Sequence, residues 1–257
     1  MGEILTVQGL ARHFGGLAAV MDLSFGVQSG EILSLIGPNG AGKTTVFNLI
    51  TGTLLPTQGE VVFQDHKITG LRPYETTSLG IARTFQTTSL FYEETVIDNL
   101  IVSYRCRTRM GFWDALFHTT FFREDERRCR QKAEEVLEFI GLGERASEFA
   151  RNIPQESQKR LALGLALVTE PKLLLLDEPM GGLAEEENIG MMALIQKVRA
   201  SGITVLLIEH KMKIVMNISD RIIVLNYGQK IAEGSPQEVG GNPAVIEAYL
   251  GVGYGEN

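Results

Sequence analysis

A glycine-rich segment that ends in lysine and threonine is the strongest chemical feature of this chain. It matches the spacing G-x-x-x-x-G-K-[ST] and reads Gly37-Pro38-Asn39-Gly40-Ala41-Gly42-Lys43-Thr44. Such a loop turns successive backbone N–H groups toward one point, and the positive end of the helix that follows adds to them. The lysine then reaches the β- and γ-phosphates of a nucleotide, and the threonine ligates Mg²⁺. We therefore predict a nucleotide site formed by residues 37–44 together with Thr45.

The elements on both sides of this loop support the prediction. Residues 31–36 form an apolar run typical of a buried strand, and residues 45–50 fit a helix. A chance match to the loop pattern alone is about a one percent event per chain at average composition. The strand before the loop and the helix after it make the chance explanation rarer still.

A pair of carboxylates gives the second chemical signal. Four leucines, 173–176, predict a strand buried on both faces, and Asp177 and Glu178 follow at its end. Ligands of α/β sheets bind at the carboxyl ends of the strands. Asp177 is predicted to hold Mg²⁺ directly or through water, and Glu178 to polarise the water that attacks the γ-phosphate. The alternative, an acidic strand end that merely faces solvent, has odds of roughly one in twenty beside such a loop.

Composition limits the remaining possibilities. The chain has 257 residues, a net charge of −7 and no apolar run near the ~20 residues that span a bilayer. The acidic balance argues against broad nucleic-acid binding, and no secretory signal opens the sequence. Cys106 and Cys129 lie far apart without a C-x-x-C spacing, so we expect reduced thiols. We expect a cytoplasmic protein that can still dock on a membrane protein.

The order of predicted elements indicates an α/β fold. Short apolar runs at 173–176, 203–208 and 222–225 predict strands separated by helical spacing, and this alternation indicates a mainly parallel sheet. A strand pair is predicted near residues 60–68. From about 97 to 167 the pattern is helical, with one amphipathic helix over 133–140 that ends at Gly141. This helical middle is predicted to be a subdomain inserted into the α/β core.

Taken together, these segments resemble the ATP-binding subunits of ABC transporters over nearly the full length. The resemblance implies roles for three further residues. Gln86, in the sequence Ala-Arg-Thr-Phe-Gln, matches the family's glutamine loop, which senses Mg²⁺ and the attacking water and couples to the membrane subunits. His210 matches the switch histidine that contacts the γ-phosphate. Phe14 lies where the family stacks an aromatic ring on adenine, although an ordinary buried phenylalanine keeps odds of about one in three.

Within that family the sequence is most similar to the branched-chain amino acid uptake group. The similar segments are Phe14-Gly15-Gly16-Leu17, 81–86, 95–100, 208–210 and 218–222. The resemblance implies a P-loop NTPase core with a mainly parallel sheet, an N-terminal antiparallel β part and an inserted helical subdomain. We expect a single nucleotide-binding domain over residues 1–250, with its core at 1–86 and 168–240, its helical subdomain at 87–167, and a C-terminal helix and tail at 241–257.

One segment departs from the family pattern. The signature Leu-Ser-Gly-Gly-Gln aligns with Ile153-Pro154-Gln155-Glu156-Ser157, and this segment of one subunit binds the γ-phosphate held by the other. Pro154 removes both a hydroxyl and an N–H. Glu156 brings a carboxylate close to phosphate, where each like charge at ~5 Å costs about 3 kcal/mol at an effective dielectric near 20. Glu156 must therefore turn away, protonate or weaken that site.

The intact loop beside an altered signature predicts the assembly. A homodimer would contain two impaired sites, whereas a heterodimer with a signature-competent ATPase subunit would contain one good site built on this chain's loop. We expect that second ATPase subunit, transmembrane permease subunits, an indirect solute-binding protein and a peripheral position on the cytoplasmic face of the inner membrane. The alternatives are a soluble scaffold or regulatory ATPase without a permease, and a nearly inactive ATP-binding partner subunit.

Overall fold

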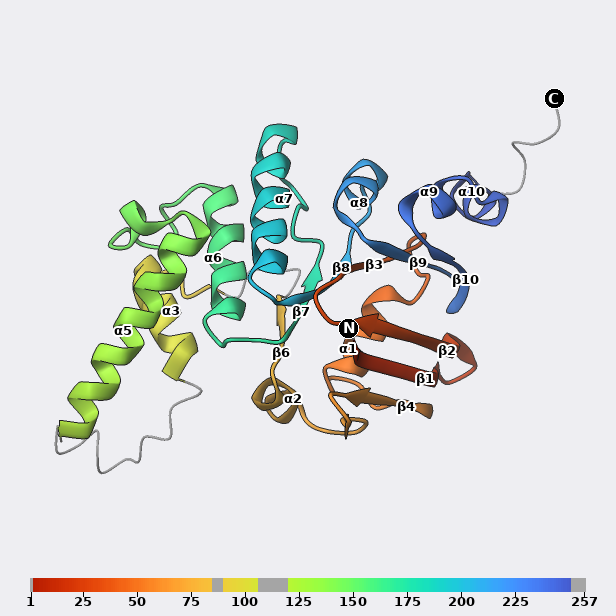
Figure 1. The fold of residues 1–257 in the computed structure, drawn as a ribbon, viewed down its shortest axis with the longest axis horizontal. Helices are drawn as coiled ribbons and strands as arrows, with labels where there is room; N and C mark the ends of the chain where they lie inside the picture. The colour runs from red at the N-terminus through yellow and green to blue at the C-terminus, as the bar shows by residue number, and fades with distance from the viewer. Residues whose placement is uncertain (1, 85–89, 106–119, 251–257) are drawn as a thin grey trace. The chain divides into compact units, whose positions relative to one another are not determined.

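The structure, a computed structural model, describes residues 2–84, 90–105 and 120–250. The contacts divide the chain into two compact units (Figure 1). The first consists of Met1–Arg83, Lys172–Pro179 and Met192–Asn257, and the second of Thr84–Pro171 and Met180–Met191. The second unit therefore includes residues 180–191, which lie outside the helical segment that the sequence predicts over about 97–167.

The first unit begins with an antiparallel sheet of strand order β2-β1-β4-β5. These strands are β1 (Glu3–Phe14), β2 (Leu17–Gln28), β4 (Gln58–Phe63) and β5 (His66–Lys67). Buried residues of β1, such as Leu5, Val7 and Leu10, face the core, while partly or fully exposed positions separate them, as expected for a sheet with one covered face. The predicted N-terminal antiparallel part is confirmed.

A second sheet of six strands, in the order β10-β9-β3-β8-β7-β6, carries the glycine-rich loop (Figure 1). Its strands are β3 (Ile32–Ile36), β6 (Ile81–Thr84), β7 (Leu173–Asp177), β8 (Thr204–Ile208), β9 (Arg221–Asn226) and β10 (Gln229–Gly234). Strand β3 pairs in parallel with β8 and β9, and β7 pairs in parallel with β8, whereas β9 and β10 are antiparallel. Every residue of β3, β7 and β8 is buried, which explains their unbroken apolar runs.

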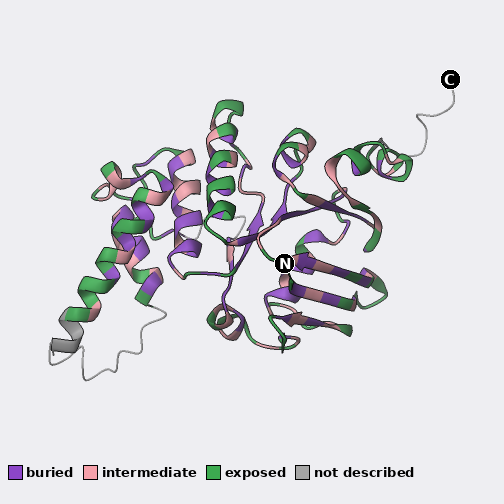
Figure 2. Ribbon diagram, in the orientation of Figure 1, coloured by how far each residue is buried: buried purple, intermediate pink, exposed green. Residues whose placement is uncertain are grey.

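Short helices accompany these sheets in the first unit. They are α1 (Lys43–Ile50), α2 (Pro73–Leu79), α8 (Met212–Ile218), α9 (Pro236–Gly240) and α10 (Pro243–Leu250). Helix α7 (Glu185–Ala200) begins in the second unit and ends in the first. The side chains of Phe47 on α1 and Phe63 on β4 are among the largest that are fully buried, and Figure 2 shows the buried residues concentrated along the strands.

The second unit is helical in its described part. It contains α3 (Val96–Arg105), α5 (Thr120–Ile140), the 3₁₀ turn η1 (Gly143–Arg145) and α6 (Gln155–Leu167). Helix α5 begins well before the predicted start at residue 133, and it ends as predicted before Gly141, whose φ is 74°. Gly164 lets α6 approach α5, since a Cβ there would lie 2.8 Å from Ile140 Cδ1. The predicted α/β core with a helical part is confirmed.

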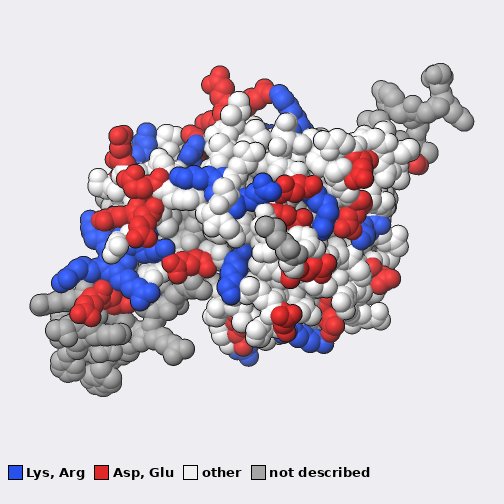
Figure 3. Space-filling model, in the orientation of Figure 1, with Lys and Arg blue, Asp and Glu red and all other residues white. Residues whose placement is uncertain are grey.

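The surface is charged, and the described helices are short or polar by the standard of membrane-spanning helices. Acidic and basic side chains are interspersed over most of the face drawn in Figure 3. Among the described residues, no helix combines the length and apolar character needed to cross a membrane.

Candidate nucleotide site

The glycines of the loop between β3 and α1 are required by its backbone. Gly37 and Gly42 have φ values of 149° and 101°, a region that side chains other than glycine rarely enter. A Cβ on Gly37 would lie 2.1 Å from the carbonyl oxygen of Leu225, and one on Gly42 would lie 2.4 Å from that of Ala19. The loop is thus held close to β2 and β9, with the N-terminus of α1 at its end.

Lys43 is buried at the start of α1 and stays close to the loop. Its Nζ donates hydrogen bonds to the carbonyl oxygens of Gly37 at 2.8 Å and Pro38 at 2.9 Å. Burial lowers the pKa of this ammonium, while the nearby carboxylates of Glu178 and Asp177 pull the pKa back up. The cation is therefore centred inside the loop, as a phosphate-binding lysine must be.

Asp177 ends β7 with its two carboxylate oxygens in different environments. Oδ2 accepts a hydrogen bond from Nη2 of Arg83 at 2.8 Å, and both side chains are almost fully buried. Oδ1 is buried and has no hydrogen-bond partner among the described residues. A buried carboxylate oxygen without a partner is costly, so this oxygen is suited to a cation or a water that a ligand brings.

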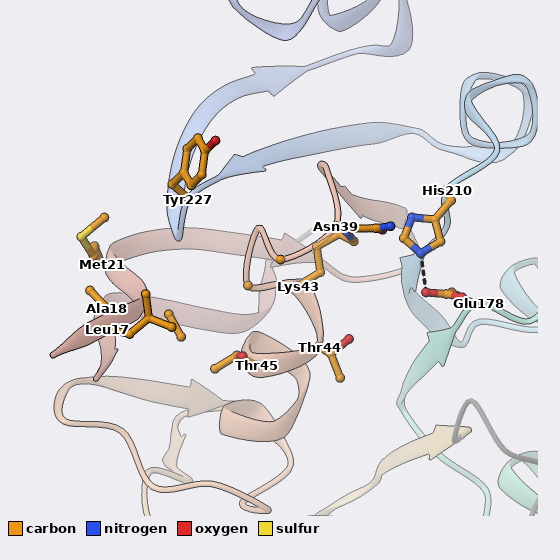
Figure 4. A pocket seen from close by; sticks show the side chains of 13 residues that line it. Leu17, Ala18, Met21, Asn39, Lys43, Thr44, Thr45, Glu178, His210 and Tyr227 are labelled. Atoms are coloured by element: carbon orange, nitrogen blue, oxygen red, sulfur yellow. Dashed lines mark hydrogen bonds and ion pairs between the residues drawn. The ribbon is translucent and has the colours of Figure 1, made fainter. Parts of the chain in front are cut away.

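Glu178 follows in a backbone conformation that is uncommon for its type. Its φ is 51°, and its N–H donates to the carbonyl oxygen of Ile208 at 2.9 Å, which ties the turn after β7 to β8. Oε1 of Glu178 forms a hydrogen bond with Nε2 of His210 (Figure 4). A left-handed residue at a strand end directs its carboxylate toward the loop, and the imidazole holds that carboxylate in place.

Loop, carboxylate and histidine line one cavity of about 420 Å³. Figure 4 shows Thr44 and Thr45 on α1, with Glu178 and His210 toward one end and Met21 and Tyr227 toward the other. The full lining is Leu17, Ala18, Ala19, Met21, Asn39, Gly40, Gly42, Lys43, Thr44, Thr45, Glu178, His210 and Tyr227. A triphosphate on the loop would thus point its terminal phosphate toward Glu178, and its base toward the end of the cavity that holds Met21 and Tyr227 (Figure 4).

Among the described residues, five predicted site residues are absent from this lining: Phe14, Gly37, Pro38, Ala41 and Asp177. Phe14 ends β1 with 44% of its surface exposed, and the Arg12 guanidinium lies 4.6 Å from its ring centroid. Pro38 and Ala41 line a neighbouring cavity of about 400 Å³ instead. Gln86 lies outside the described residues.

Tyr227 lines the cavity although no sequence pattern indicates a site role for it. It occupies the turn between β9 and β10, has a φ of 44° and is 81% exposed. No motif marks a tyrosine in such a turn, and it lies far from the loop in sequence. Its place in the cavity depends on the β3–β9 pairing, which the sequence alone does not specify.

In the second unit, the altered signature segment shows how Glu156 is accommodated. Pro154 caps α6 without a side-chain hydrogen bond, and Glu156 lies in the first turn. Oε1 of Glu156 accepts from Nε and Nη2 of Arg160, both at 2.7 Å. Of the three expected outcomes, the carboxylate therefore turns along its own helix and pairs with an arginine.

Comparisons with known proteins agree with this geometry. Residues 20–181 match the family model described as ABC transporter, and residues 229–255 match that of the branched-chain amino acid ATP-binding cassette transporter. The chain is 45% identical to the high-affinity branched-chain amino acid transport ATP-binding protein LivG of Salmonella typhimurium over 96% of this chain and 98% of that protein. It is 43% identical to BraF of Pseudomonas aeruginosa, a protein of the same description, with the same coverage.

The solved structures that resemble this chain are also ATP-binding cassettes of ABC transporters. An ATP-binding cassette of an ABC transporter in its ADP conformation has a TM-score of 0.86 and 35% identity, covering 98% of this chain and all of that one. A nucleotide-free cassette has a TM-score of 0.85 and 34% identity, covering 97% of this chain. The phosphate loop, the two carboxylates, the fold and the sequence matches all indicate the same family. This chain belongs to the ABC transporter family as an ATP-binding subunit.

Proposed function

We propose that this chain is the ATP-hydrolysing subunit of a membrane importer for branched-chain or related amino acids. One observation carries the proposal: Glu178, held by His210, lies in the same cavity as the phosphate loop. A carboxylate beside the phosphate loop supports the role of Glu178 as the general base for water attack on the terminal phosphate. The transported substrate class is supported by the relatives described as branched-chain amino acid transport proteins.

The residues of the cavity and the neighbouring Asp177 divide the chemistry between them. The loop amides and Lys43 bind the phosphates, and Thr44 with Asp177 would hold Mg²⁺. The unpartnered Oδ1 of Asp177 fits this role, since Mg²⁺ is bound by one or two carboxylates together with phosphate oxygens and water. Magnesium there would neutralise charge that develops on the phosphates. Glu178 accepts a proton from the attacking water, and His210 orients Glu178 and reaches toward the γ-phosphate.

The importer proposal also assigns partners. Gln86 would sense the occupied site and couple it to transmembrane permease subunits, which receive solute from a separate binding protein. The chain would lie peripherally on the cytoplasmic face of the inner membrane, with residues 87–167 as its helical subdomain.

Gentle extraction from native membranes tests this function directly. Purification through a tag on this chain should recover two permease chains and a second ATP-binding subunit. A chain that hydrolyses ATP but recovers no membrane protein would instead be a soluble scaffold or regulatory ATPase. In that case the importer proposal would be wrong.

Base stacking provides a prediction about affinity. We expect Phe14→Ala to weaken ATP binding by roughly 5- to 100-fold, because stacking of one base on an aromatic ring contributes about 1–3 kcal/mol. Binding of inorganic tripolyphosphate, which lacks a base, should not change. Titration calorimetry measures both affinities, with Tyr227→Ala as the comparison because Tyr227 lines the cavity. A loss confined to Tyr227→Ala would transfer the stacking role to that residue.

We further propose that the functional dimer pairs this chain with a different ATP-binding subunit. Positions 154–156 lack the serine and two glycines that would contact a partner's γ-phosphate, and Pro154 offers no hydrogen-bond donor. Arg160 pairs with Glu156, but position 156 still carries a long side chain where the family has a glycine. The good site would combine this chain's loop with the partner's signature.

Restoring the signature should make the chain active by itself. We expect the triple variant Pro154→Ser, Gln155→Gly, Glu156→Gly to raise ATP turnover of the isolated chain by about 10-fold or more, because lost phosphate donors typically cost 10²–10³ in rate. The assay is phosphate release at several protein concentrations. Glu134→Gly is the control, since it removes another i,i+4 pair, with Arg130 on α5, outside the signature. Equal turnover of the triple variant and the wild-type chain would contradict this explanation.

A further inference from the structure

Arg83 is a buried cation that no motif assigns to the site. It lies on β6, and its side chain is only 7% exposed, against 1% for that of Asp177. Guanidinium groups carry a permanent charge and are rarely buried without a specific role for that charge. Arg83, Asn48 and Asp177 all belong to the first unit, so their geometry lies within one compact body.

The guanidinium bridges the phosphate-loop helix and the strand that ends in Asp177. Nη1 donates to Oδ1 of Asn48 at 2.6 Å, and Nη2 donates to Oδ2 of Asp177 at 2.8 Å. The ring of Phe47, fully buried on α1, lies with its centroid 5.4 Å from the guanidinium carbon. The planar fork of arginine can make both bonds at once in fixed directions, which a lysine cannot.

This bridge connects Asp177 to α1, the helix that carries Thr44. Asn48 follows Thr44 by four residues on α1, and residues four apart share one face of a helix. The same guanidinium also fixes Oδ2 of Asp177, which leaves Oδ1 buried and without a partner among the described residues. One side chain thus sets the position of the Thr44 face and the orientation of the Asp177 carboxylate.

We infer that Arg83 is the positioning residue of the magnesium site, which holds the Asp177 carboxylate so that Oδ1 faces the cation beside Thr44. This inference rests on the proposed function, since it concerns the same site. Groups that orient a metal ligand typically change metal affinity by about 10- to 100-fold when replaced. Arg83 would therefore act on the magnesium-dependent part of nucleotide binding and leave the loop's contacts with phosphate unchanged.

The test compares the affinity of the full chain for ADP in Mg²⁺ and in EDTA by titration calorimetry. The ratio of the dissociation constant in EDTA to that in Mg²⁺ measures how much magnesium strengthens ADP binding. For Arg83→Lys we expect this ratio to fall by about 10-fold or more, with the dissociation constant in EDTA within about twofold of wild type. Arg199→Lys is the matched control, because Arg199 also bridges a carbonyl, that of Gly30, and a carboxylate, that of Asp220, at an exposed site.

A second variant covers the case in which Arg83→Lys does not fold. Asn48→Ala keeps both charges and removes only the acceptor on α1. It should lower the ratio by about threefold, less than Arg83→Lys, because Asp177 keeps its own bond to Arg83. Affinity that falls equally in Mg²⁺ and EDTA, or a ratio that stays at the wild-type value, would overturn the inference. A wild-type chain whose ADP affinity is the same with and without Mg²⁺ would instead contradict the proposed magnesium chemistry itself.

Discussion

Replacing Glu178 with glutamine should lower ATP turnover by about 10²- to 10⁴-fold while ATP affinity stays within about twofold, because general-base catalysis contributes that much to rate. Glutamine keeps the size of the side chain and can still hydrogen-bond to His210, but it cannot accept a proton from water. The variant complex should therefore retain ATP and accumulate in its nucleotide-bound state. Phosphate release and retention of labelled ATP measure the two effects.

The matched control for this variant is Glu170→Gln. Glu170 has the same φ of 51° as Glu178, but it pairs with Lys132 in the second unit. Its replacement should leave turnover within about twofold of wild type, since an exposed ion pair contributes only about 0–1 kcal/mol. If Glu178→Gln kept wild-type turnover, the general-base assignment would be wrong.

Replacing Lys43 with alanine should weaken ATP binding by at least about 100-fold. Each hydrogen bond between charged groups contributes about 1.5–3 kcal/mol, and Lys43 would make such bonds to two phosphates. Equilibrium binding of a fluorescent ATP analogue measures the loss. The fold should persist, because within the described part of the chain the Lys43 ammonium bonds to two carbonyls of its own loop, those of Gly37 and Pro38.

Lys43→Met separates charge from packing in the same experiment. Methionine keeps much of the aliphatic stem that is buried at the start of α1, so its thermal unfolding should match that of wild type, while its ATP affinity should match that of Lys43→Ala. Near wild-type affinity in Lys43→Met would show that packing, and not the ammonium, accounts for the role of this residue.

Most of the fold could be predicted because its signals are local. The unbroken apolar runs of β3, β7 and β8 reflect strands buried on both faces, and periodicity alone reveals them. The start of α5 could not be found this way. Its first half is rich in charged residues, whereas Ala133 and Leu137 in its second half are buried, so apolar periodicity marks the second half more clearly.

In the site, too, the residues with local sequence signals could be predicted and those placed by non-local contacts could not. The phosphate loop and the Asp177-Glu178 pair are contiguous in sequence, so their chemistry is readable there. Arg83 and Tyr227 were not predicted, because each reaches the site only through pairing between strands far apart in the chain. The sequence did indicate that Glu156 conflicts with a phosphate, but its pairing with Arg160 depends on side-chain conformation.

We propose that this chain supplies one half of an ATP site and that a different subunit supplies the other half. The most direct measurement is the ATPase rate of the purified chain alone, over a range of its own concentration, against the rate of the chain with the ATP-binding subunit recovered from native membranes. We predict slow turnover by the chain alone without second-order dependence on its concentration, and a large increase with the partner. Transporter-like turnover by the chain alone, rising with the square of its concentration, would contradict the account.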